Sequence, residues 1–417
     1  MKQKKLLFLG GIMQQIPAIK KARELGYYVI TADYLPDNPG HQFSDEYHNV
    51  STTDCEAMLA LAKSLQIDGI VAYASDPAAP TAAYVAEKMG LPGNPYESVK
   101  LLTEKDRFRD FLATHGFNSP RHVGFAEKDA CLRAFDSVED PATAAIRFPV
   151  MVKPVDSSGS KGVVKVMRHP ATSAEDRRLF EAAVDEAFSY SRGGRIVVEE
   201  FIVKKGYQVS GDGFSIDGKL VFTSYGNELY SGKGTREYVA LGEFWPSLLT
   251  AEQKRKVDAE LQRLIRALGM RTCAYNIEVI LDADDNVYVL ELGPRNGGSY
   301  IPQLIQYATG VDMVEITLKA AMGEVLPPLG MVPTTGVWSN YMIYSTVSGK
   351  FKRLAFDPVF ERENLLEVHC TAQVGDEIHA YQNTSHSLGT ILFRAESVER
   401  MTEITSNIEK YYQVEVE

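Results

Sequence analysis

"LELGPRNGGS", residues 290–299, places the carboxylate of Glu291 between two leucines, just before a glycine-rich loop that carries Arg295. The residues before it, 287–290, are valine, tyrosine and leucine, a composition typical of a buried strand. A carboxylate inside such a strand needs a partner, because burying an unpaired charge is costly. The partner of Glu291 therefore has to come from another part of the chain.

The strand that precedes this one supplies a second carboxylate. Residues 276–281, "NIEVIL", are followed by an Asp/Asn-rich turn, which predicts a hairpin. If the loop comprises residues 283–286, Glu278 lies directly opposite Glu291, with Cβ atoms roughly 5 Å apart. A shorter or longer loop would shift this pairing. Two like charges so close require a shared proton, a basic side chain or a cation, and paired oxygen donors suit a Mg²⁺ ion that bridges phosphates.

The composition excludes several classes of protein. The chain has 417 residues, 45% hydrophobic and 24% charged, which is typical of globular domains with a sizeable core. Its 55 acidic residues exceed its 44 basic ones, so the net charge of −11 argues against a nucleic-acid partner. The four cysteines form no CxxC pair, which argues against a zinc site or a disulfide framework and favours the cytoplasm.

No segment is predicted to cross a membrane. Residues 2–13 begin like a signal peptide, but the apolar run stops at Gln14 and no cleavage site follows, so a first strand is the better interpretation. Residues 325–349 contain no charged residue. They do contain three prolines and many polar residues, which a spanning helix does not tolerate. We expect no membrane partner.

The N-terminal part alternates strands and helices. The pattern over residues 1–95 predicts right-handed crossovers and a parallel, Rossmann-like sheet. Asp33 ends the second predicted strand, where an acid could bind a ribose, but no GxGxxG motif precedes it. A dinucleotide site is therefore not expected.

The rest of the chain divides into four predicted parts. Residues 96–122 form a connecting segment whose helix opens at a capping box, Thr103 to Asp106, and places Lys105 and Arg109 on one face. Residues 123–202 form a lid of short strands around one helix, and residues 203–325 form a core that holds the hairpin. Residues 326–417 form a small β-rich domain.

Elements of a phosphate site accompany the hairpin. Lys153 interrupts an apolar strand just before the Ser/Gly-rich loop 157–162, which offers backbone N–H groups and hydroxyls to phosphate oxygens. That loop is also compatible with a simple hairpin turn. It is not a Walker A motif, and residues 232–235, "GKGT", come closest to one without satisfying it.

The chain resembles the ATP-grasp enzymes in the order and spacing of four motifs. They are PVMVKP at 149–154 with the loop 157–162, VEEFI at 198–202, NIE at 276–278 and ELGPR at 291–295. This superfamily includes biotin carboxylase, carbamoyl phosphate synthetase, glycinamide ribonucleotide synthetase, D-alanyl-D-alanine ligases and bacterial L-amino acid ligases. The resemblance implies a mixed α/β and α+β fold, with a Rossmann-like N-terminal domain, ATP-grasp central and core domains and a β-rich C-terminal domain.

The resemblance also implies a role for each matching residue. Lys105 and Lys153 match the lysines that hold the ATP phosphates, and Arg295 matches the arginine that holds the transferred phosphate; Lys153 and Arg295 are the predicted catalytic residues. Glu278 and Glu291 match the magnesium carboxylates. The other residues implied to bind ATP are Ser157, Ser158, Gly159 and Ser160 in the mobile loop, Glu199 at the adenine amino group, the edge Glu200, Phe201 and Ile202, and Gln208 at the ribose.

Two positions depart from the commonest family pattern. Gly293 stands where the family often has an asparagine that contributes to the metal, so the number of metal ions stays open. Gln208 stands where a glutamate often binds the ribose hydroxyls, and a Gln can still accept from a hydroxyl. The first departure concerns metal geometry, and the second concerns the affinity for ATP.

The resemblance implies an ATP- and Mg²⁺-dependent ligase, with Mn²⁺ as an alternative ion. We expect it to phosphorylate a carboxylate to an acyl phosphate, which an amine then attacks, with release of ADP and phosphate. The alternatives are a carboxylase-like enzyme that activates bicarbonate and a non-catalytic ATP-binding regulator. The expected partners are small-molecule carboxylates and amines. The sequence is compatible with a homodimer but does not fix the oligomeric state.

Two further groups of residues have weaker patterns. Lys233 and Arg236, in the polar segment 226–237, are candidates for binding a substrate carboxylate or phosphate, although the segment also fits a long hairpin loop. His369, His379 and His386 have loose spacings that favour surface or packing roles over a metal site.

Overall fold

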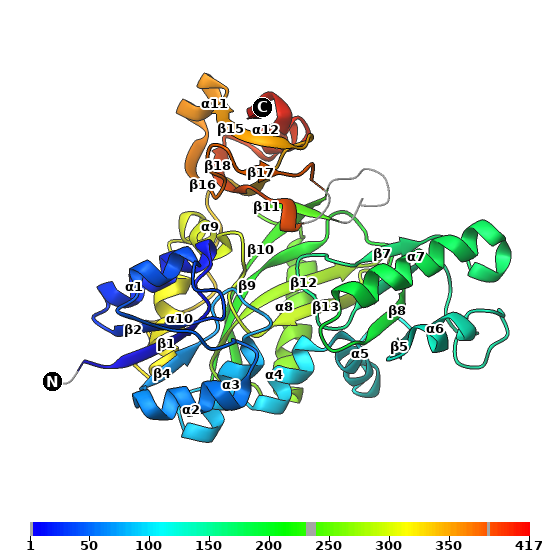
Figure 1. Cartoon of the computed structure of the whole chain (residues 1–417), viewed down its shortest axis with the longest axis horizontal. Helices are drawn as coiled ribbons and strands as arrows, with labels where there is room; N and C mark the ends of the chain where they lie inside the picture. Colours follow the sequence, from blue (N-terminus) through cyan, green and yellow to red (C-terminus); the bar gives the residue numbers. More distant parts are fainter. Residues whose placement is uncertain (1–2, 231–238, 382–383) are drawn as a thin grey trace.

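The computed structural model describes residues 3–230, 239–381 and 384–417. In Figure 1 the N-terminal sheet (blue) and the lid (green, with α7) lie on opposite sides of a large central sheet, and the C-terminal residues (orange to red) lie at its top. The described helices include none long and apolar enough to cross a membrane. The predicted mixed architecture is confirmed.

The N-terminal domain is a parallel sheet in the order β3-β2-β1-β4, as its strand-helix alternation predicts. Apolar residues point to both faces of its central strand: Leu7 and Leu9 pack with α2 and α3, and Leu6 and Phe8 pack with α1 and α10. Its elements, with the two helices that follow, are β1 (Lys5–Leu9), α1 (Ile16–Glu24), β2 (Tyr28–Ala32), β3 (Glu46–His48), α2 (Cys55–Leu65), β4 (Gly69–Val71), α3 (Ala79–Met89), α4 (Tyr96–Thr103) and α5 (Lys105–Thr114).

The predicted capping box at Thr103 is wrong. The Thr103 hydroxyl donates to the carbonyl of Lys100, inside α4, so it caps nothing in α5. Glu104 occupies the N-cap position of α5 and makes no side-chain cap bond there. The two helices abut without a linker, and a sequence pattern does not distinguish the last residue of one helix from the cap of the next. Lys105 and Arg109 nevertheless lie on one face of α5, one turn apart.

The lid is an antiparallel sheet in the order β5-β8-β6-β7. Phe180, Val184 and Ala187 of α7 pack on Val150 and Val198 of the sheet. Ser173 begins α7 by accepting from the backbone N–H of Asp176. A second helix, α6, was not predicted. The elements are β5 (His122–Phe125), α6 (Lys128–Ala134), β6 (Val150–Pro154), β7 (Val164–Val166), α7 (Ala174–Tyr190) and β8 (Ile196–Glu200).

The core is an eight-stranded sheet in the order β13-β12-β9-β10-β11-β14-β18-β16. On one face Leu261 and Leu264 of α8 pack against Ile277, and on the other Leu304 of α9 packs against Trp245 and Phe214. The elements are β9 (Val209–Ile216), β10 (Lys219–Tyr230), β11 (Ala240–Trp245), α8 (Ala251–Ala267), β12 (Cys273–Leu281), β13 (Val287–Gly293), α9 (Ile301–Thr309) and α10 (Met313–Ala321).

This sheet continues past the expected boundary at residue 325. β14 pairs with β11, so the last strands extend the core instead of forming a separate sheet, and only β17-β15-β19 make a small sheet of their own. Two helices of this part were not predicted from its strand-rich pattern. The elements are β14 (Val337–Ile343), β15 (Gly349–Phe356), α11 (Pro358–Glu363), β16 (Leu365–Cys370), β17 (Glu377–Ile378), β18 (Gly389–Ala395), α12 (Val398–Ser406) and β19 (Tyr412–Val416).

Candidate active site

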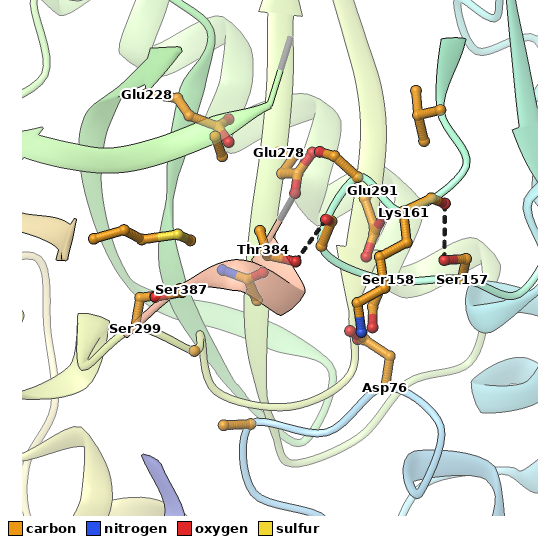
Figure 2. Close-up of a pocket in the computed structure, with 18 of the residues that line it drawn as sticks. Asp76, Ser157, Ser158, Lys161, Glu228, Glu278, Glu291, Ser299, Thr384 and Ser387 are labelled. Carbon is orange, nitrogen blue, oxygen red and sulfur yellow. Dashed lines mark hydrogen bonds between the residues drawn. The ribbon is translucent and has the colours of Figure 1, made fainter. Parts of the chain in front are cut away.

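One cavity of about 950 Å³ is lined by all of the site residues that the sequence predicts. It lies against the core sheet and also receives residues from the N-terminal domain, the lid and the C-terminal part. Figure 2 shows Glu278 and Glu291 next to each other in it, with the loop of Ser157 and Ser158 beside them. The predicted residues on its walls are Lys105, Lys153, Ser157, Ser158, Gly159, Ser160, Glu199, Glu200, Phe201, Ile202, Gln208, Glu278, Glu291 and Arg295.

Glu278 lies directly opposite Glu291, as predicted, but the loop length and the strand register that bring them together differ from those assumed. Leu281 pairs with Val287, so the loop comprises five residues, 282–286, and the assumed four-residue loop is wrong. That loop alone would shift the pairing by one residue. A β-bulge at Leu290, between Glu278 and Val279 on the facing strand, restores it.

The bulge at Leu290 is held by α5. Its carbonyl accepts a hydrogen bond of 2.9 Å from Nη1 of Arg109, whose side chain is only 1% exposed. A bulge leaves a backbone group without its ladder partner, and an unpaired buried carbonyl would be costly. Arg109 supplies that partner and thereby fixes the register on which the two carboxylates depend.

The two carboxylates are electrostatically poised for a cation. Burial raises the pKa of Glu278 well above its usual value, and the nearby charges of Glu228 and Glu291 raise it further. The nearest cation is Lys105, whose Nζ lies 3.5 Å from Oε2 of Glu291. The described residues offer no group of three acidic, histidine or cysteine ligands here. A two-carboxylate site of this kind fits Mg²⁺, which commonly completes its coordination with water and substrate phosphates.

Gly293 is explained by its neighbours. A Cβ at this position would lie 3.0 Å from Oδ1 of Asp76 and 3.4 Å from Cζ of Arg295. The space that an asparagine side chain would need is therefore filled by an ion pair. The departure from the family pattern follows from the presence of Asp76, which comes from the loop after β4.

Arg295 is held in a fork by Asp76. Its Nε donates to Oδ1 at 2.7 Å, its Nη2 donates to Oδ2 at 2.5 Å, and both side chains are largely buried. Burial disfavours the charge of Arg295, but Asp76 more than offsets it and raises the arginine's pKa. Sequence reasoning missed Asp76, although an acid just beyond the end of a parallel strand is a usual position for a site residue.

The loop that carries Arg295 has a second anchor, Asp212 on β9. The backbone N–H of Gly297 donates to both carboxylate oxygens of Asp212, each at 2.9 Å. A Cβ at Gly297 would lie 2.8 Å from the same carboxylate, so this approach requires glycine. Burial raises the pKa of Asp212 to about 7. Asp212 was also missed, and it lies in a strand where no motif marks it.

Glu199 is clamped between two cations. Its Oε2 accepts from Nε of Arg109 at 2.8 Å, and its Oε1 forms a short ion pair with Nζ of Lys153. Burial opposes its charge, but these two cations lower its pKa to about 2. Both oxygens therefore already have donors, so an adenine amino group would have to share them. The carboxylate also fixes the position of the Lys153 ammonium on the cavity wall.

The Ser/Gly-rich loop 157–162, called the flap below, lines the cavity and is held there by hydrogen bonds. The Ser157 hydroxyl donates to the carbonyl of Lys161 at 3.0 Å, and Nζ of Lys105 donates to the carbonyl of Ser157 at 2.9 Å. Thr384, from the C-terminal part, donates through Oγ1 to the carbonyl of Gly159 at 2.8 Å. Figure 2 shows this contact bridging the two segments. The alternative of an isolated hairpin turn does not account for it.

The predicted adenine edge lies at the end of β8. The backbone N–H of Glu200 donates to the Arg121 carbonyl, and that of Phe201 donates to the Pro149 carbonyl. These bonds anchor the edge to the lid, and Ile202 follows on the cavity wall.

Gln208 does not stand alone at the expected ribose position. Its Nε2 donates to Oε2 of Glu228 at 2.6 Å and to Oε2 of Glu278 at 3.2 Å. Its amide nitrogen is thus engaged between two carboxylates.

The remaining candidates have different outcomes. Lys233 and Arg236 lie outside the described residues, as does the GKGT segment. His369 lines the cavity, stacked on the ring of Tyr300 at 3.8 Å between centroids, and its Nε2 lies 2.7 Å from Glu367. His369 therefore packs on Tyr300 and lies within hydrogen-bond distance of Glu367, in line with the predicted packing role.

Comparison with known proteins decides the family of the central region. Residues 146–303 match the ATP-grasp domain family. This chain contains an ATP-grasp domain. The matched region holds the flap, both opposed carboxylates and Arg295, so the family resemblance seen in the sequence motifs is confirmed.

Solved structures share the fold of this protein over the whole chain. An L-amino acid ligase from Bacillus licheniformis is 23% identical, with a TM-score of 0.80, and the match covers 100% of both chains. A second structure is the biotin carboxylase domain of 2-oxoglutarate carboxylase from Hydrogenobacter thermophilus, a dimer solved with MgADP, ADP and bicarbonate. It is 19% identical, with a TM-score of 0.73, and the match covers 99% of this chain and 90% of that one. At these identities the likeness concerns the fold.

The curated relatives match this chain over only part of their own length. An uncharacterized protein, y4rH, from Sinorhizobium fredii is 28% identical over 285 residues, which cover 67% of this chain and 55% of that protein. The carbamoyl phosphate synthase large chain from Thermotoga petrophila is 23% identical over 331 residues, 78% of this chain and 27% of that one. The chain thus spans about half or less of the length of these relatives.

Proposed function

We propose that this protein is an ATP- and Mg²⁺-dependent ligase that joins a carboxylate to an amine. The observation that carries the proposal is the opposed pair Glu278 and Glu291, which shares one cavity with Lys105, Lys153, the flap and Arg295. Two acidic oxygens facing basic side chains suit a metal-bound nucleotide whose terminal phosphate is transferred.

Each residue has a distinct task in this proposal. Glu278 and Glu291 would hold Mg²⁺, which neutralises phosphate charge when bound. Lys105 and Lys153 would contact the phosphates, and the flap residues 157–160 would exclude water from them. Arg295, positioned by Asp76, would stabilise the charge that develops on the transferred phosphoryl group.

The reaction balances in two steps. A carboxylate oxygen attacks the γ-phosphorus of ATP, the bond to the β-phosphate oxygen breaks, and ADP leaves with the electron pair. The amine nitrogen then attacks the acyl carbon, and the bond to the phosphate oxygen breaks. The nitrogen gives up a proton as the amide forms, and inorganic phosphate is released.

The test is incubation of the protein with ATP, Mg²⁺ and a panel of carboxylic acids and amines. We expect release of ADP and phosphate that depends on both substrates. Formation of AMP and pyrophosphate would overturn the mechanism. Turnover that needs only bicarbonate would replace it with the carboxylase-like alternative, in which bicarbonate is the activated acid. Binding of ATP without turnover across the panel would favour the regulatory alternative.

The proposed partners are small molecules, and the proposed location is the cytoplasm. Four free cysteines, with no disulfide among them, support a reducing compartment. A homodimer is also proposed, supported by the dimer reported for the biotin carboxylase domain from Hydrogenobacter thermophilus.

A further inference from the structure

A second pair of carboxylates, Glu228 and Glu243, lines the same cavity and has no task in the proposed mechanism. Glu228 on β10 is paired directly with Glu243 on β11. Directly opposed residues of an antiparallel pair project from the same face, with Cβ atoms roughly 5 Å apart. Glu228 is 7% exposed. This second pair is therefore a like-charged contact of the same kind as that between Glu278 and Glu291.

The second pair lies next to the first on the same sheet face. Gln208 on β9 stands between them and donates to Glu228 and to Glu278. Figure 2 shows Glu228 and Glu278 extending from the sheet into the cavity. A molecule that reaches from the phosphate end along this face therefore meets Glu228 and Glu243.

Glu228 accepts a hydrogen bond from Gln208, so what the described residues lack is a counter-charge for the pair. No ion pair joins either carboxylate to a lysine or arginine in the part of the chain that the structure describes. The ammonium of Lys204, whose charge acts on Glu228, lies over the ring of Tyr230, 4.4 Å from its centroid. Oε2 of Glu243 is buried and has no hydrogen-bond partner.

The pKa values of both carboxylates are raised, as expected for buried acids that have no counter-charge among the described residues. Burial, and then the charge of Glu243, raises the pKa of Glu228 to about 8. Burial raises the pKa of Glu243 to about 7. Near neutral pH the pair therefore favours a bound positive charge, because such a charge stabilises both ionised carboxylates.

A third acceptor lies on the same face. The hydroxyl of Ser210 on β9, 2% exposed, has no hydrogen-bond partner. Ser210 pairs directly with Glu278 on one side and with Gly226, two residues from Glu228, on the other. A buried hydroxyl without a partner is costly, so Ser210 adds an unsatisfied polar group to the sheet face that carries the four carboxylates.

We propose that Glu228 and Glu243 bind the primary ammonium group of a substrate. This proposal rests on the proposed ligase function and names the chemistry of the substrate at this end of the cavity. An ammonium donates three hydrogen bonds and carries one positive charge, which suits two adjacent carboxylates on the cavity wall. The ammonium can belong to the amine substrate or to an amino-bearing carboxylic acid.

The kinetic test uses Glu243→Gln in the full chain. Loss of a charge-assisted hydrogen bond is expected to raise the KM for the ammonium-bearing substrate about 10- to 100-fold. The KM for ATP should stay within about twofold, since Glu243 takes no part in holding ATP. The KM of an amino acid is compared with that of its deamino analogue at a fixed amine concentration. If Glu243→Gln raises the KM for the amino acid but not for the analogue, the bound ammonium belongs to the acid. If it raises the KM for the amine alone, the bound ammonium belongs to the amine. Unchanged KM values for both would overturn the proposal.

A binding test separates this proposal from the ligase function. The probe is n-propylammonium chloride, compared with n-propanol and with sodium chloride at equal ionic strength. We expect the ammonium to raise the melting temperature of the unmodified protein and to leave that of Glu243→Gln unchanged. Equal shifts in both proteins would overturn the proposal, even if the protein shows no ligase turnover.

A matched control and a second variant guard against a merely structural effect. Glu252→Gln, whose side chain is 71% exposed at the start of α8, should behave like the unmodified protein in both tests. Glu228→Gln should raise the KM for the same substrate as Glu243→Gln does. If Glu228→Gln and Glu243→Gln raise the KM for ATP and for the substrate equally, the pair is structural and the proposal fails.

Discussion

Asp76 and Arg295 are 219 residues apart in the sequence and form a two-pronged ion pair, at 2.7 and 2.5 Å, that joins the N-terminal domain to the loop after β13. The same carboxylate fills the space beside Gly293. This ion pair therefore positions Arg295, the arginine expected at the transferred phosphate. It also restricts the side chain at position 293, two residues after Glu291.

Asp76→Asn should lower the stability of the protein. The change leaves a largely buried arginine without its counter-charge, which typically costs about 3–5 kcal/mol of unfolding free energy. Urea denaturation measures this loss. Glu415→Gln, which breaks the exposed ion pair with Arg353, is the matched control and should leave the urea midpoint unchanged. An Asp76→Asn variant as stable as the control would show that the fork carries no net stabilisation.

Glu278→Gln should lower activity and raise stability together. Loss of a metal-binding carboxylate is expected to reduce ATP turnover at least about 100-fold. Burial raises the pKa of Glu278, so its ionised form destabilises the metal-free fold, and a neutral amide removes that effect at about pH 8. ADP release and urea denaturation in EDTA provide the two readouts. A variant that is less stable without metal would contradict this account.

The stability of the metal-free protein should fall as pH rises from about 4 to about 8. The folded pKa values of Asp212, Glu228 and Glu243 are raised, to about 7, about 8 and about 7. In that window the folded state keeps protons that the unfolded state has lost, so their contribution disappears as pH rises. Glu199, with a pKa of about 2, acts in the opposite sense and loses its contribution as pH falls below about 4.

Urea denaturation in EDTA at several pH values measures this dependence. Glu228→Gln should reduce the difference in unfolding free energy between about pH 5.5 and about pH 8.5, because the titrating group is gone. An unchanged difference would mean that Glu228 titrates near its usual value in the folded state.

Thr384→Val should weaken ATP binding. The change removes the hydrogen bond to the Gly159 carbonyl that joins the C-terminal part to the flap, and one such bond is worth about 1 kcal/mol, or about fivefold in KM for ATP. Thr405→Val is the control, since its hydroxyl donates to a carbonyl of its own helix. Equal KM values for the two variants would show that the contact does not close the flap.

Local patterns in the sequence determined much of this protein. Alternating strands and helices predicted the parallel N-terminal sheet, and the Asp/Asn turn between two apolar runs predicted the hairpin. The isolated acids Glu278 and Glu291 predicted the centre of the cavity, because a charge in an apolar strand requires a partner. The same signal marks Glu228 and Glu243, each an acid within a strand, but it does not say that their strands are neighbours.

The tertiary structure alone decided how these parts meet. The five-residue loop and the bulge at Leu290 became visible only with Arg109, which supplies the bulge's hydrogen bond from another domain. The contacts of Asp76 with Arg295 and of Thr384 with Gly159 join residues more than 200 positions apart. Periodicity and turn chemistry act over a few residues, whereas these contacts depend on how separate sheets pack, and no local pattern encodes that packing.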